Sequence, residues 1–379
     1  MEKNVKTIKA GLPVQAGDIL PAREAMEMFQ FVEFKSPIPI PELPKKGLHA
    51  DILDNERTFL HGEIKRLAKR DNVLILAHNY EDQDVQDAAH YVGDSLHLAK
   101  IGRESKADFI FEASVLFMLH VLAVMKQPHQ VILAPDLGAL CSLAAHADAG
   151  KIRAWKSEHH GGIVVSYINT YLDVKAESDY CCTSANTAQV IQYAIKKNPG
   201  ASILFLPDVH LGIWAANMLE EMGEPLDRLY LMMGACHVHD GIRPSDIAEK
   251  LEQHPDADLV VHPECGCTSA CMTQLREGKI KERMLQFRST QGMFQYIKDS
   301  SNKKFIMATE VGNEYAIRKA VGPGKEIIPA SDNAICAFMK QNTLRKLYGS
   351  IRDKKHVITV DSELARRARL PIERMLAIV

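Results

Sequence analysis

The stretch Arg228–Asp240, RLYLMMGACHVHD, predicts a buried strand with a chemically active turn at its end. Its first part, Leu229–Met233, is an apolar run of strand length. Gly234 follows, as glycine does where another backbone or a ligand comes close to a strand end. Cys236 and two histidines come next, and parallel sheets bind their ligands at the carboxyl ends of their strands. We therefore take these residues as the first candidates for a functional site.

Two further cysteines stand in similar surroundings. Cys141 follows the apolar run 131–136, and Cys336 follows the run 326–332, each after a short polar turn. Cys141 lies 95 residues before Cys236, and Cys336 lies 100 residues after it. This even spacing predicts three similar units, each of which brings one thiolate to a shared centre.

Short apolar runs that end in polar residues recur along the chain, and helical segments separate them. Such near-continuous runs are typical of parallel strands that are covered on both faces. They lie at 73–80, 108–114, 131–136, 162–169, 202–208, 229–234, 258–264, 304–310 and 326–332. The alternation predicts an α/β fold, with three similar parallel-sheet domains arranged with pseudo-three-fold symmetry around a central active site.

The expected domain boundaries follow from this alternation. Residues 1–50 are rich in proline near their end and lack a clear period, so we expect an N-terminal extension with a short helix near 21–29. The three α/β domains are then expected at 51–130 together with 340–379, at 131–228 and at 229–339.

Composition argues against several classes of protein. The 379 residues carry a net charge of −2 with a pI of about 6.8, so no basic surface for nucleic acid is indicated. The best membrane candidate, 109–125, contains Glu112 and His120 and is shorter than the roughly 20 apolar residues of a span. The N-terminus lacks the apolar core of a signal peptide. Eight cysteines without such a signal indicate a reducing compartment, and we expect a cytoplasmic protein.

Three hydroxyl residues stand where predicted helices begin. Ser95, Ser184 and Thr290 occupy positions at which Ser and Thr commonly act as N-caps, and the simplest interpretation is that they only cap. If the three helix starts point inward, however, their unpaired N–H groups and dipoles form a site for an anion. We expect a phosphate group at that centre.

The three spaced cysteines suggest an incompletely ligated metal group. A structural zinc ion or a saturated iron–sulfur cluster takes four protein ligands. Three thiolates leave one metal position free for a substrate, and a metal with a free position acts as a Lewis acid. The alternative is that each is an ordinary buried cysteine, since free cysteine is among the most buried residue types.

A second group of cysteines competes for the same role. Cys265, Cys267 and Cys271 are close together in the chain, but their spacing matches neither the paired zinc pattern nor the bacterial ferredoxin pattern. They could hold a metal, form a redox disulfide or do neither. Cys181 and Cys182 are adjacent, and we interpret them as packing or reactive thiols.

At this point the motifs, taken in order, resemble those of one family, quinolinate synthase. The resemblance covers about residues 70–340. The matching motifs are AHNY (77–80), GDS (93–95), PDLGALCSLA (135–144), Y-x-N-T (167–170), TSAN (183–186), GACHVHDG (234–241), HPEC (262–265) and TE-x-G (309–312), followed by Cys336.

The resemblance implies a fold, a cofactor and a reaction. It implies three α/β domains around a pseudo-three-fold axis, with a 4Fe-4S cluster held by Cys141, Cys236 and Cys336. The reaction is the condensation of iminoaspartate with dihydroxyacetone phosphate to quinolinate, with release of phosphate and water, in NAD biosynthesis. The substrate-binding motifs map onto His78, Tyr80, Ser95, Tyr167, Asn169, Ser184, His262, Glu264 and Thr290.

One pair of these residues is expected to move protons. Glu264 and His262 are two apart on a predicted strand and therefore point to the same side. The resemblance makes Glu264 the general acid–base, and a neighbouring histidine suits proton transfer. The alternative is a strand-end salt bridge, because ionic networks can mimic active sites.

The remaining candidates are expected to position the substrates. Tyr80 and His78 would act on the triose, catalytically or by orienting it, and Tyr167 and Asn169 would hydrogen-bond the dicarboxylate. Three further strand-end polar residues are assigned to loop structure: Asp136, Asp208 and His210.

Two other functions stay open from the sequence. One is a different iron–sulfur hydro-lyase, which also uses three thiolates and an open iron. The other is an iron–sulfur redox sensor, although one that binds nucleic acid would need a basic surface. The expected partners are the two small-molecule substrates and an enzyme that supplies iminoaspartate, with no nucleic acid and no membrane.

Overall fold

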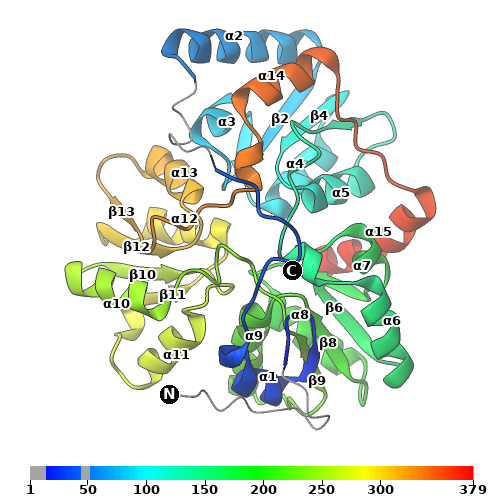
Figure 1. Ribbon diagram of the computed structural model, residues 1–379, viewed down its shortest axis with the longest axis vertical. Coiled ribbons are helices and arrows are strands. Elements are labelled where there is room, and N and C mark those ends of the chain that lie inside the picture. The colour runs from blue at the N-terminus through cyan, green and yellow to red at the C-terminus, as the bar shows by residue number, and fades with distance from the viewer. Residues whose placement is uncertain (1–13, 44–51, 379) are drawn as a thin grey trace.

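The computed structural model describes residues 14–43 and 52–378, whose strands form three separate sheets around a common centre (Figure 1). The first sheet is parallel, in the order β3-β2-β4-β5. Its strands are β2 (Val73–His78), β3 (Tyr91–Gly93), β4 (Phe109–Ala113) and β5 (Val131–Leu133).

The second and third sheets repeat the parallel arrangement. The second has the order β1-β9-β8-β6-β7, in which only β1 is antiparallel to its neighbour. Its strands are β1 (Ile19–Pro21), β6 (Ile163–Tyr167), β7 (Tyr180–Cys182), β8 (Ile203–Leu206) and β9 (Leu229–Met232). The third has the order β11-β10-β12-β13, with strands β10 (Asp258–Val261), β11 (Leu285–Phe287), β12 (Lys304–Ala308) and β13 (Glu326–Pro329).

Helices cover the faces of each sheet. Those grouped with the first sheet are α2 (Asp54–Arg70), α3 (Gln83–Ala88), α4 (Ser95–Glu104), α5 (Leu116–Met125) and α14 (Leu344–Asp353). Those grouped with the second are α1 (Ala22–Met28), α6 (Ala149–Glu158), α7 (Leu172–Ala176), α8 (Thr187–Lys197), α9 (Val209–Glu221) and α15 (Ser362–Ile378). Those of the third are α10 (Pro244–Gln253), α11 (Thr268–Arg276), α12 (Thr290–Asp299) and α13 (Gly312–Val321). Short 3-10 turns lie at Phe29–Phe31, Ala144–His146, Glu282–Met284 and Met339–Gln341.

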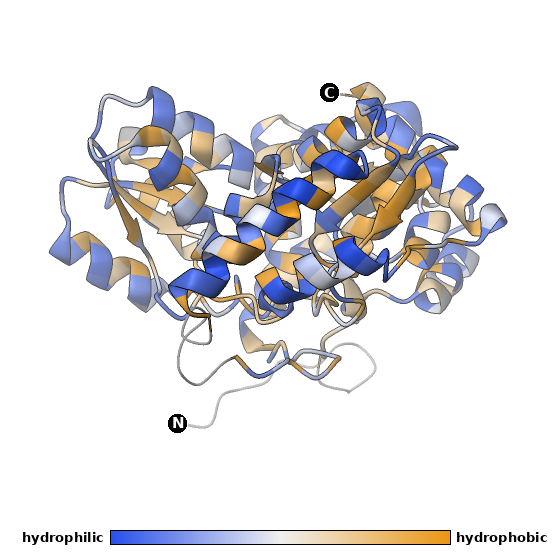
Figure 2. Cartoon of the chain, turned by 90° about the horizontal axis from the view of Figure 1, so that it is seen from above, coloured by the Kyte–Doolittle hydropathy of each residue, from blue (hydrophilic) through white to orange (hydrophobic). Residues whose placement is uncertain are grey.

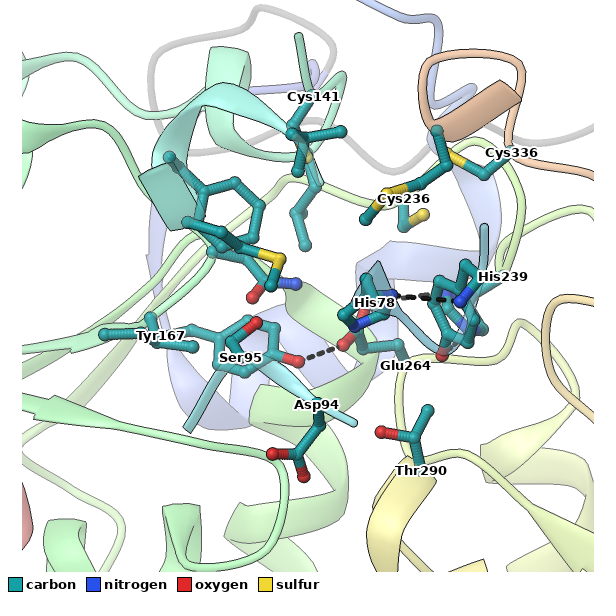
Figure 3. Close-up of a pocket in the computed structure, with 18 of the residues that line it drawn as sticks. His78, Asp94, Ser95, Cys141, Tyr167, Cys236, His239, Glu264, Thr290 and Cys336 are labelled. Atoms are coloured by element: carbon teal, nitrogen blue, oxygen red, sulfur yellow. Dashed lines mark hydrogen bonds and ion pairs between the residues drawn. The ribbon is translucent and has the colours of Figure 1, made fainter. Parts of the chain in front are cut away.

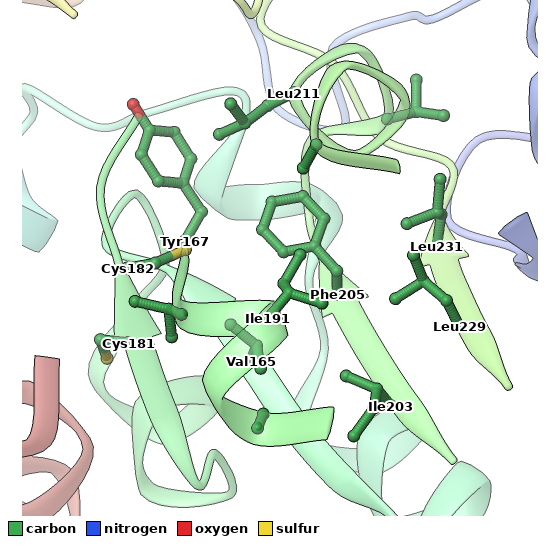
Figure 4. Packing of buried hydrophobic residues seen from close by; sticks show 14 of the residues in the cluster. Val165, Tyr167, Cys181, Cys182, Ile191, Ile203, Phe205, Leu211, Leu229 and Leu231 are labelled. Carbon is green, nitrogen blue, oxygen red and sulfur yellow. The ribbon is translucent and has the colours of Figure 1, made fainter. Parts of the chain in front are cut away.

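The strands are buried because both of their faces are covered. They are mainly hydrophobic, whereas the helices place hydrophilic residues outward (Figure 2). In the second sheet, Val165 and Phe205 pack against Ile191 of α8 and Leu211 of α9 (Figure 4). Full burial of such a side chain stabilises the fold by roughly 1.5–3 kcal/mol. None of the helices in the described part of the chain is both long and apolar enough to cross a bilayer.

The structure confirms the predicted α/β class with three parallel sheets, and it confirms the short N-terminal helix as α1. The second and third domains were expected to begin at 131 and 229, with β5 and β9. In the structure β5 pairs with β4 and belongs to the first sheet, and β9 pairs with β8 and belongs to the second sheet. The expected extension also contributes a strand, since β1 pairs with β9. Apolar periodicity identifies strands but does not encode which neighbour each strand pairs with.

The C-terminal residues divide between two sheets. Helix α14 packs against α2 of the first sheet, as expected for 340–379. Helix α15 instead packs against α7 and β7 of the second sheet, where Ala368, Ile372 and Met375 join the core. The amphipathic pattern of α15 predicts a buried face but not the surface that covers it.

The chain passes from one sheet to the next through three equivalent turns, each of which begins with a cysteine. In each turn, the backbone N–H four residues on donates to the cysteine carbonyl, at 3.1 Å for Cys141, 2.8 Å for Cys236 and 3.1 Å for Cys336. A helix begins eight residues after each cysteine, at 149, 244 and 344. These helices pack on the second, third and first units respectively, so the three crossovers close a ring.

Candidate active site

A cavity lies where the three sheets meet, and the space between its lining atoms, including the part open to solvent, is about 740 Å³. The carboxyl ends of β2, β6 and β10 contribute residues to it, as expected for parallel sheets. Every predicted site residue lines this cavity: His78, Tyr80, Ser95, Cys141, Tyr167, Asn169, Ser184, Cys236, His262, Glu264, Thr290 and Cys336. Figure 3 labels eight of them, from His78 to Cys336.

The three crossover cysteines are partly buried and lie on one side of the cavity (Figure 3). The backbone N–H of Ala144 donates to the Cys141 sulfur at 3.4 Å. The backbone N–H groups of His239 and Met339 likewise hydrogen-bond to the thiols of Cys236 and Cys336. Burial outweighs these donors and raises the pKa of the Cys141 thiol to about 11 and that of Cys336 to about 12.

The main chain of each cysteine is held from behind by a polar side chain. The Tyr171 hydroxyl accepts the N–H of Cys141 at 3.2 Å. Glu310 Oε1 accepts the N–H of Cys336 at 3.0 Å and forms a buried ion pair with Lys340 at 2.9 Å. The carboxyl group of Asp208 interacts with the N–H of Cys236. The three turns are therefore fixed independently of any bound group.

The competing cysteine group lies outside the cavity. Cys265, Cys267 and Cys271 are buried in the apolar core of the third unit. The Cys265 thiol donates to the Ala308 carbonyl at 3.0 Å, and the Cys267 thiol contacts both other thiols. Cys181 and Cys182 lie in the core of the second sheet (Figure 4), as the packing interpretation predicted.

Glu264 is surrounded by polar groups at the bottom of the cavity. The Tyr167 hydroxyl donates to its Oε1, while Nδ1 of His239 lies 3.5 Å from Oε2 and Nδ1 of His262 lies 3.7 Å from Oε1. Burial raises the pKa of Glu264 to about 7 and lowers the pKa of His262 to about 3. Burial also lowers the pKa of His239 well below its usual value, so both rings favour the neutral form in these contacts. A carboxyl group with a pKa near neutrality can both donate and accept a proton.

The structure places two further residues beside Tyr80: His239, which was among the first candidates, and Thr309, which was not among the predicted site residues. The Tyr80 hydroxyl lies 2.9 Å from Thr309 Oγ1 and 3.3 Å from His239 Nε2, and these two atoms are 3.2 Å apart. The second ring nitrogen of His239, Nδ1, is buried without a hydrogen-bond partner and faces Glu264. His239 follows Cys236 by three residues and Thr309 follows β12, so both stand at positions that the strand-end rule highlights.

The three hydroxyl residues line the cavity, but the prediction that they are N-caps was wrong. Asp94 caps α4 and Ser289 caps α12, by accepting N–H groups at 2.9 Å and 3.2 Å. The N-cap of α8 is Asn186, two residues after the predicted Ser184. Helix boundaries read from a sequence are uncertain by one or two residues. No described residue hydrogen-bonds to the side-chain hydroxyls of Ser95, Ser184 and Thr290.

The other strand-end polar residues have structural partners. His78 Nδ1 accepts the N–H of Tyr80 at 3.1 Å, and burial lowers the pKa of His78 to about 3. Asp136 accepts the N–H of Gly138 at 2.7 Å, as expected for a loop residue. Asp208 caps α9, and His210 pairs with Asp240. The assignment to loop structure therefore agrees for Asp136 and was wrong for His210, which lies within helix α9, while Asp208 forms the N-cap of that helix.

Comparisons with known proteins identify the family. The family model described as quinolinate synthetase A protein matches residues 62–377. A quinolinate synthase of Pyrobaculum aerophilum is 41% identical over 317 residues, which cover 84% of this chain and 99% of that protein. Quinolinate synthases of Thermus thermophilus and Mycobacterium tuberculosis are 40% and 37% identical, over 83% of this chain and 96% and 88% of theirs. The chain therefore belongs to the quinolinate synthetase A family of enzymes.

Proposed function

We propose that the protein condenses iminoaspartate with dihydroxyacetone phosphate to quinolinate, with release of phosphate and water, as a step of NAD biosynthesis. The proposal includes a 4Fe-4S cluster bound by Cys141, Cys236 and Cys336. The observation that carries it is the meeting of three cysteine turns at one cavity that also holds a carboxyl group with a near-neutral pKa. The relatives named quinolinate synthase support quinolinate as the product.

The cysteine turns fit an iron–sulfur cluster. Backbone N–H groups directed at cysteine sulfurs are a common feature of such sites and tune their potentials. Among the described residues, the set whose ligand atoms all lie within 4.8 Å of one another is Cys236, His239 and Glu264. Neither Cys141 nor Cys336 belongs to that set, yet both of their thiols act electrostatically on the Cys236 thiol, which suits one group shared by the three cysteines. With three protein ligands, such a cluster would have one open iron that supplies Lewis-acid chemistry.

The hydroxyl groups of Ser95, Ser184 and Thr290 would bind the phosphate of the triose. Two of these residues begin helices α4 and α12, whose first N–H groups also favour an anion. None of the three hydroxyls has another partner among the described residues, so they can donate to phosphate oxygens without breaking a bond. Tyr167 and Asn169 follow β6 of the second sheet, line the same cavity and would bind the dicarboxylate.

Proton transfer would involve two groups of residues. Glu264 can exchange a proton near neutral pH, and His262 beside it is neutral and can orient the carboxyl group. Burial raises the pKa of the Tyr80 hydroxyl well above its usual value, so this group stays protonated. Tyr80 would therefore act as a hydrogen-bond donor to the triose, with His239 and Thr309 fixing its position, and His78 orients the adjacent backbone.

An anaerobic preparation tests the proposal directly. We expect about four iron and four sulfide per chain, a visible absorption band and formation of quinolinate from the two substrates. Turnover of hydroxy acids in place of iminoaspartate and the triose phosphate would favour an iron–sulfur hydro-lyase instead. A cluster without turnover of either substrate set would favour a redox sensor. The proposal also includes a cytoplasmic location and a partner enzyme that supplies iminoaspartate, and the eight unpaired cysteines suit a reducing compartment.

A further inference from the structure

The N-terminal segment 14–43 packs beside the turn that carries Cys236, although it lies outside the matched family region 62–377. Strand β1 pairs with β9, which leads directly into this turn, and α1 packs against α9 (Figure 1). The N–H of Gly17 donates to the Met233 carbonyl at 2.6 Å, and the N–H of Met233 donates to the Asp18 carbonyl at 2.7 Å. The segment therefore fixes the backbone three residues before Cys236.

The same segment also acts on the other side of the turn. The rings of Phe29 and Phe34 each contact the ring of His210 edge-on, with centroids 5.8 Å apart. His210 Nε2 lies 3.0 Å from an oxygen of Asp240, whose backbone N–H donates to the Cys236 carbonyl at 2.8 Å. Phe29 and Phe34 therefore fix the ring of His210, and His210 in turn fixes Asp240 at the end of the turn.

The two other cysteine turns are supported from within the matched region. Tyr171 contacts the main chain of Cys141, and Glu310 with Lys340 supports Cys336. Residues before position 62 also contact the helices that follow the other two turns, since Lys151 Nζ donates to the Gly17 carbonyl at 2.9 Å and Arg345 pairs with Glu56 at 2.6 Å. Among the described residues, however, they hydrogen-bond to the backbone that leads into the cysteine only at Cys236. The Pyrobaculum aerophilum relative, 99% of which is matched by 317 residues, has no counterpart of comparable length.

We infer that the N-terminal segment positions Cys236, with Phe29 and Phe34 holding His210 against Asp240 so that the thiol stays directed into the cavity. Only the expected effect on a bound cluster rests on the proposed function, because the position of the Cys236 thiol can be tested in the protein without a cluster. Phe29, Phe34 and His210 are positioning residues, because none of them lines the cavity.

The first test measures the reactivity of the three thiols in the protein without a cluster. The double variant Phe29→Ala/Phe34→Ala is treated with iodoacetamide, and the alkylation rate of each cysteine is followed by mass spectrometry. We expect Cys236 to react about tenfold faster, because local opening exposes it, while Cys141 and Cys336 keep their parental rates. The matched control is Phe31→Ala, which lies in the same 3-10 turn but is 41% exposed.

Three outcomes decide the inference. A selective increase at Cys236, reversed in Phe29→Leu/Phe34→Leu, supports it. An equal increase at all three cysteines would show general loosening and overturn it. Unchanged rates, or the same increase in Phe31→Ala, would overturn it as well.

The second test uses the anaerobic protein loaded with iron and sulfide. We expect a chelator to remove the visible absorbance of the double variant several-fold faster than that of the parent, and loss at the parental rate would overturn the inference for the cluster. If the parent binds no cluster at all, the proposed function fails. In that case the alkylation rates alone decide whether the segment positions Cys236.

Discussion

Two sets of three cysteines occupy this protein, and they differ in what their sulfur atoms contact. Cys141, Cys236 and Cys336 are about a hundred residues apart in the chain, yet they share one cavity. The other set, 265, 267 and 271, is compact in the chain and buried in one core. Its thiols contact each other and the Ala308 carbonyl. The thiols of the compact set contact other protein atoms of the core, whereas the thiols of the dispersed set line the cavity.

This difference teaches how to distinguish a structural cysteine from a candidate ligand. Proximity in the chain produced a buried cluster of small apolar side chains, which is the ordinary role of free cysteine. The dispersed cysteines lie at crossovers, after a strand end and at the start of a helical turn. Backbone N–H groups of the turn donate to their sulfur atoms, and the thiols line the cavity. The position of a cysteine in the fold is therefore more informative here than its spacing from the next cysteine.

The strongest test of the comparison removes one sulfur from each set. In Cys236→Ala, we expect loss of the visible absorbance and of most bound iron in an anaerobic preparation, because a cluster with two remaining thiolates is poorly held. In Cys271→Ala, we expect parental iron content. Circular dichroism shows whether each variant is folded.

The same experiment separates a cluster from a single ion. Cys141 does not belong to the close set of Cys236, His239 and Glu264. Cys141→Ala should therefore remove iron as completely as Cys236→Ala. Full retention of metal in Cys141→Ala would show that a single ion at the close set, rather than a cluster, is bound.

Glu264 provides the next largest expected effect. It precedes Cys265 in the chain, but a carboxylate oxygen of Glu264 lies within 4.8 Å of the Cys236 sulfur. We expect Glu264→Gln to reduce turnover at least ~100-fold, which is the usual size of a general acid–base contribution, while iron content stays parental. The initial rate of quinolinate formation measures this. Turnover within a few-fold of the parent would remove Glu264 from proton transfer and leave it a structural role.

Much of this arrangement could be predicted from the sequence, and the missing parts share a cause. Apolar runs predicted nine of the thirteen described strands, and strand ends and helix starts predicted the cavity residues, because these signals are local. The short strands β1, β3, β7 and β11 were missed, since three residues carry too little of the apolar pattern. The pairing of β5 with β4, the pairing of β9 with β8 and the packing of α15 on the second sheet depend on contacts between distant parts of the chain. Local periodicity does not encode such contacts. His239 and Thr309 were missed as partners of Tyr80 because their contacts join residues about 160 and 230 positions away. The three caps were misplaced by one or two residues, since neighbouring polar residues all resemble caps.

A pH series compares Glu264 with a buried carboxyl group outside both cysteine sets. Burial raises the pKa of Glu264 and of Glu112 in β4 from 4.5 to about 7. A raised carboxyl pKa means that the fold favours the protonated form. Its contribution to stability is therefore present below pH 4.5 and is lost as the pH rises through 7. At pH 8 the loss is roughly 3 kcal/mol per group.

Glutamine does not ionise, so both substitutions should relieve this loss. Relative to the parent without a cluster, we expect Glu264→Gln and Glu112→Gln to gain stability progressively as the pH rises, measured by urea unfolding. Only Glu264→Gln should also lose turnover. A pH-independent difference between parent and variant would mean that the carboxyl group titrates at its ordinary value in the folded state.

The smallest expected effect compares two neighbouring hydroxyl residues, Ser289, which has a contact within the fold, and Thr290, which lines the cavity. Ser289 caps α12 through its contact with the Gly292 N–H, whereas the hydroxyl of Thr290 has no partner among the described residues and faces the cavity. We expect Ser289→Ala to lower stability by about 1 kcal/mol and to leave the KM for the triose phosphate nearly unchanged. We expect Thr290→Val to keep stability but to raise that KM about tenfold, as the loss of one hydrogen bond to a charged group would. Equal changes in KM for both variants would indicate that the helix start as a whole binds the phosphate, and that the hydroxyl of Thr290 has no separate role.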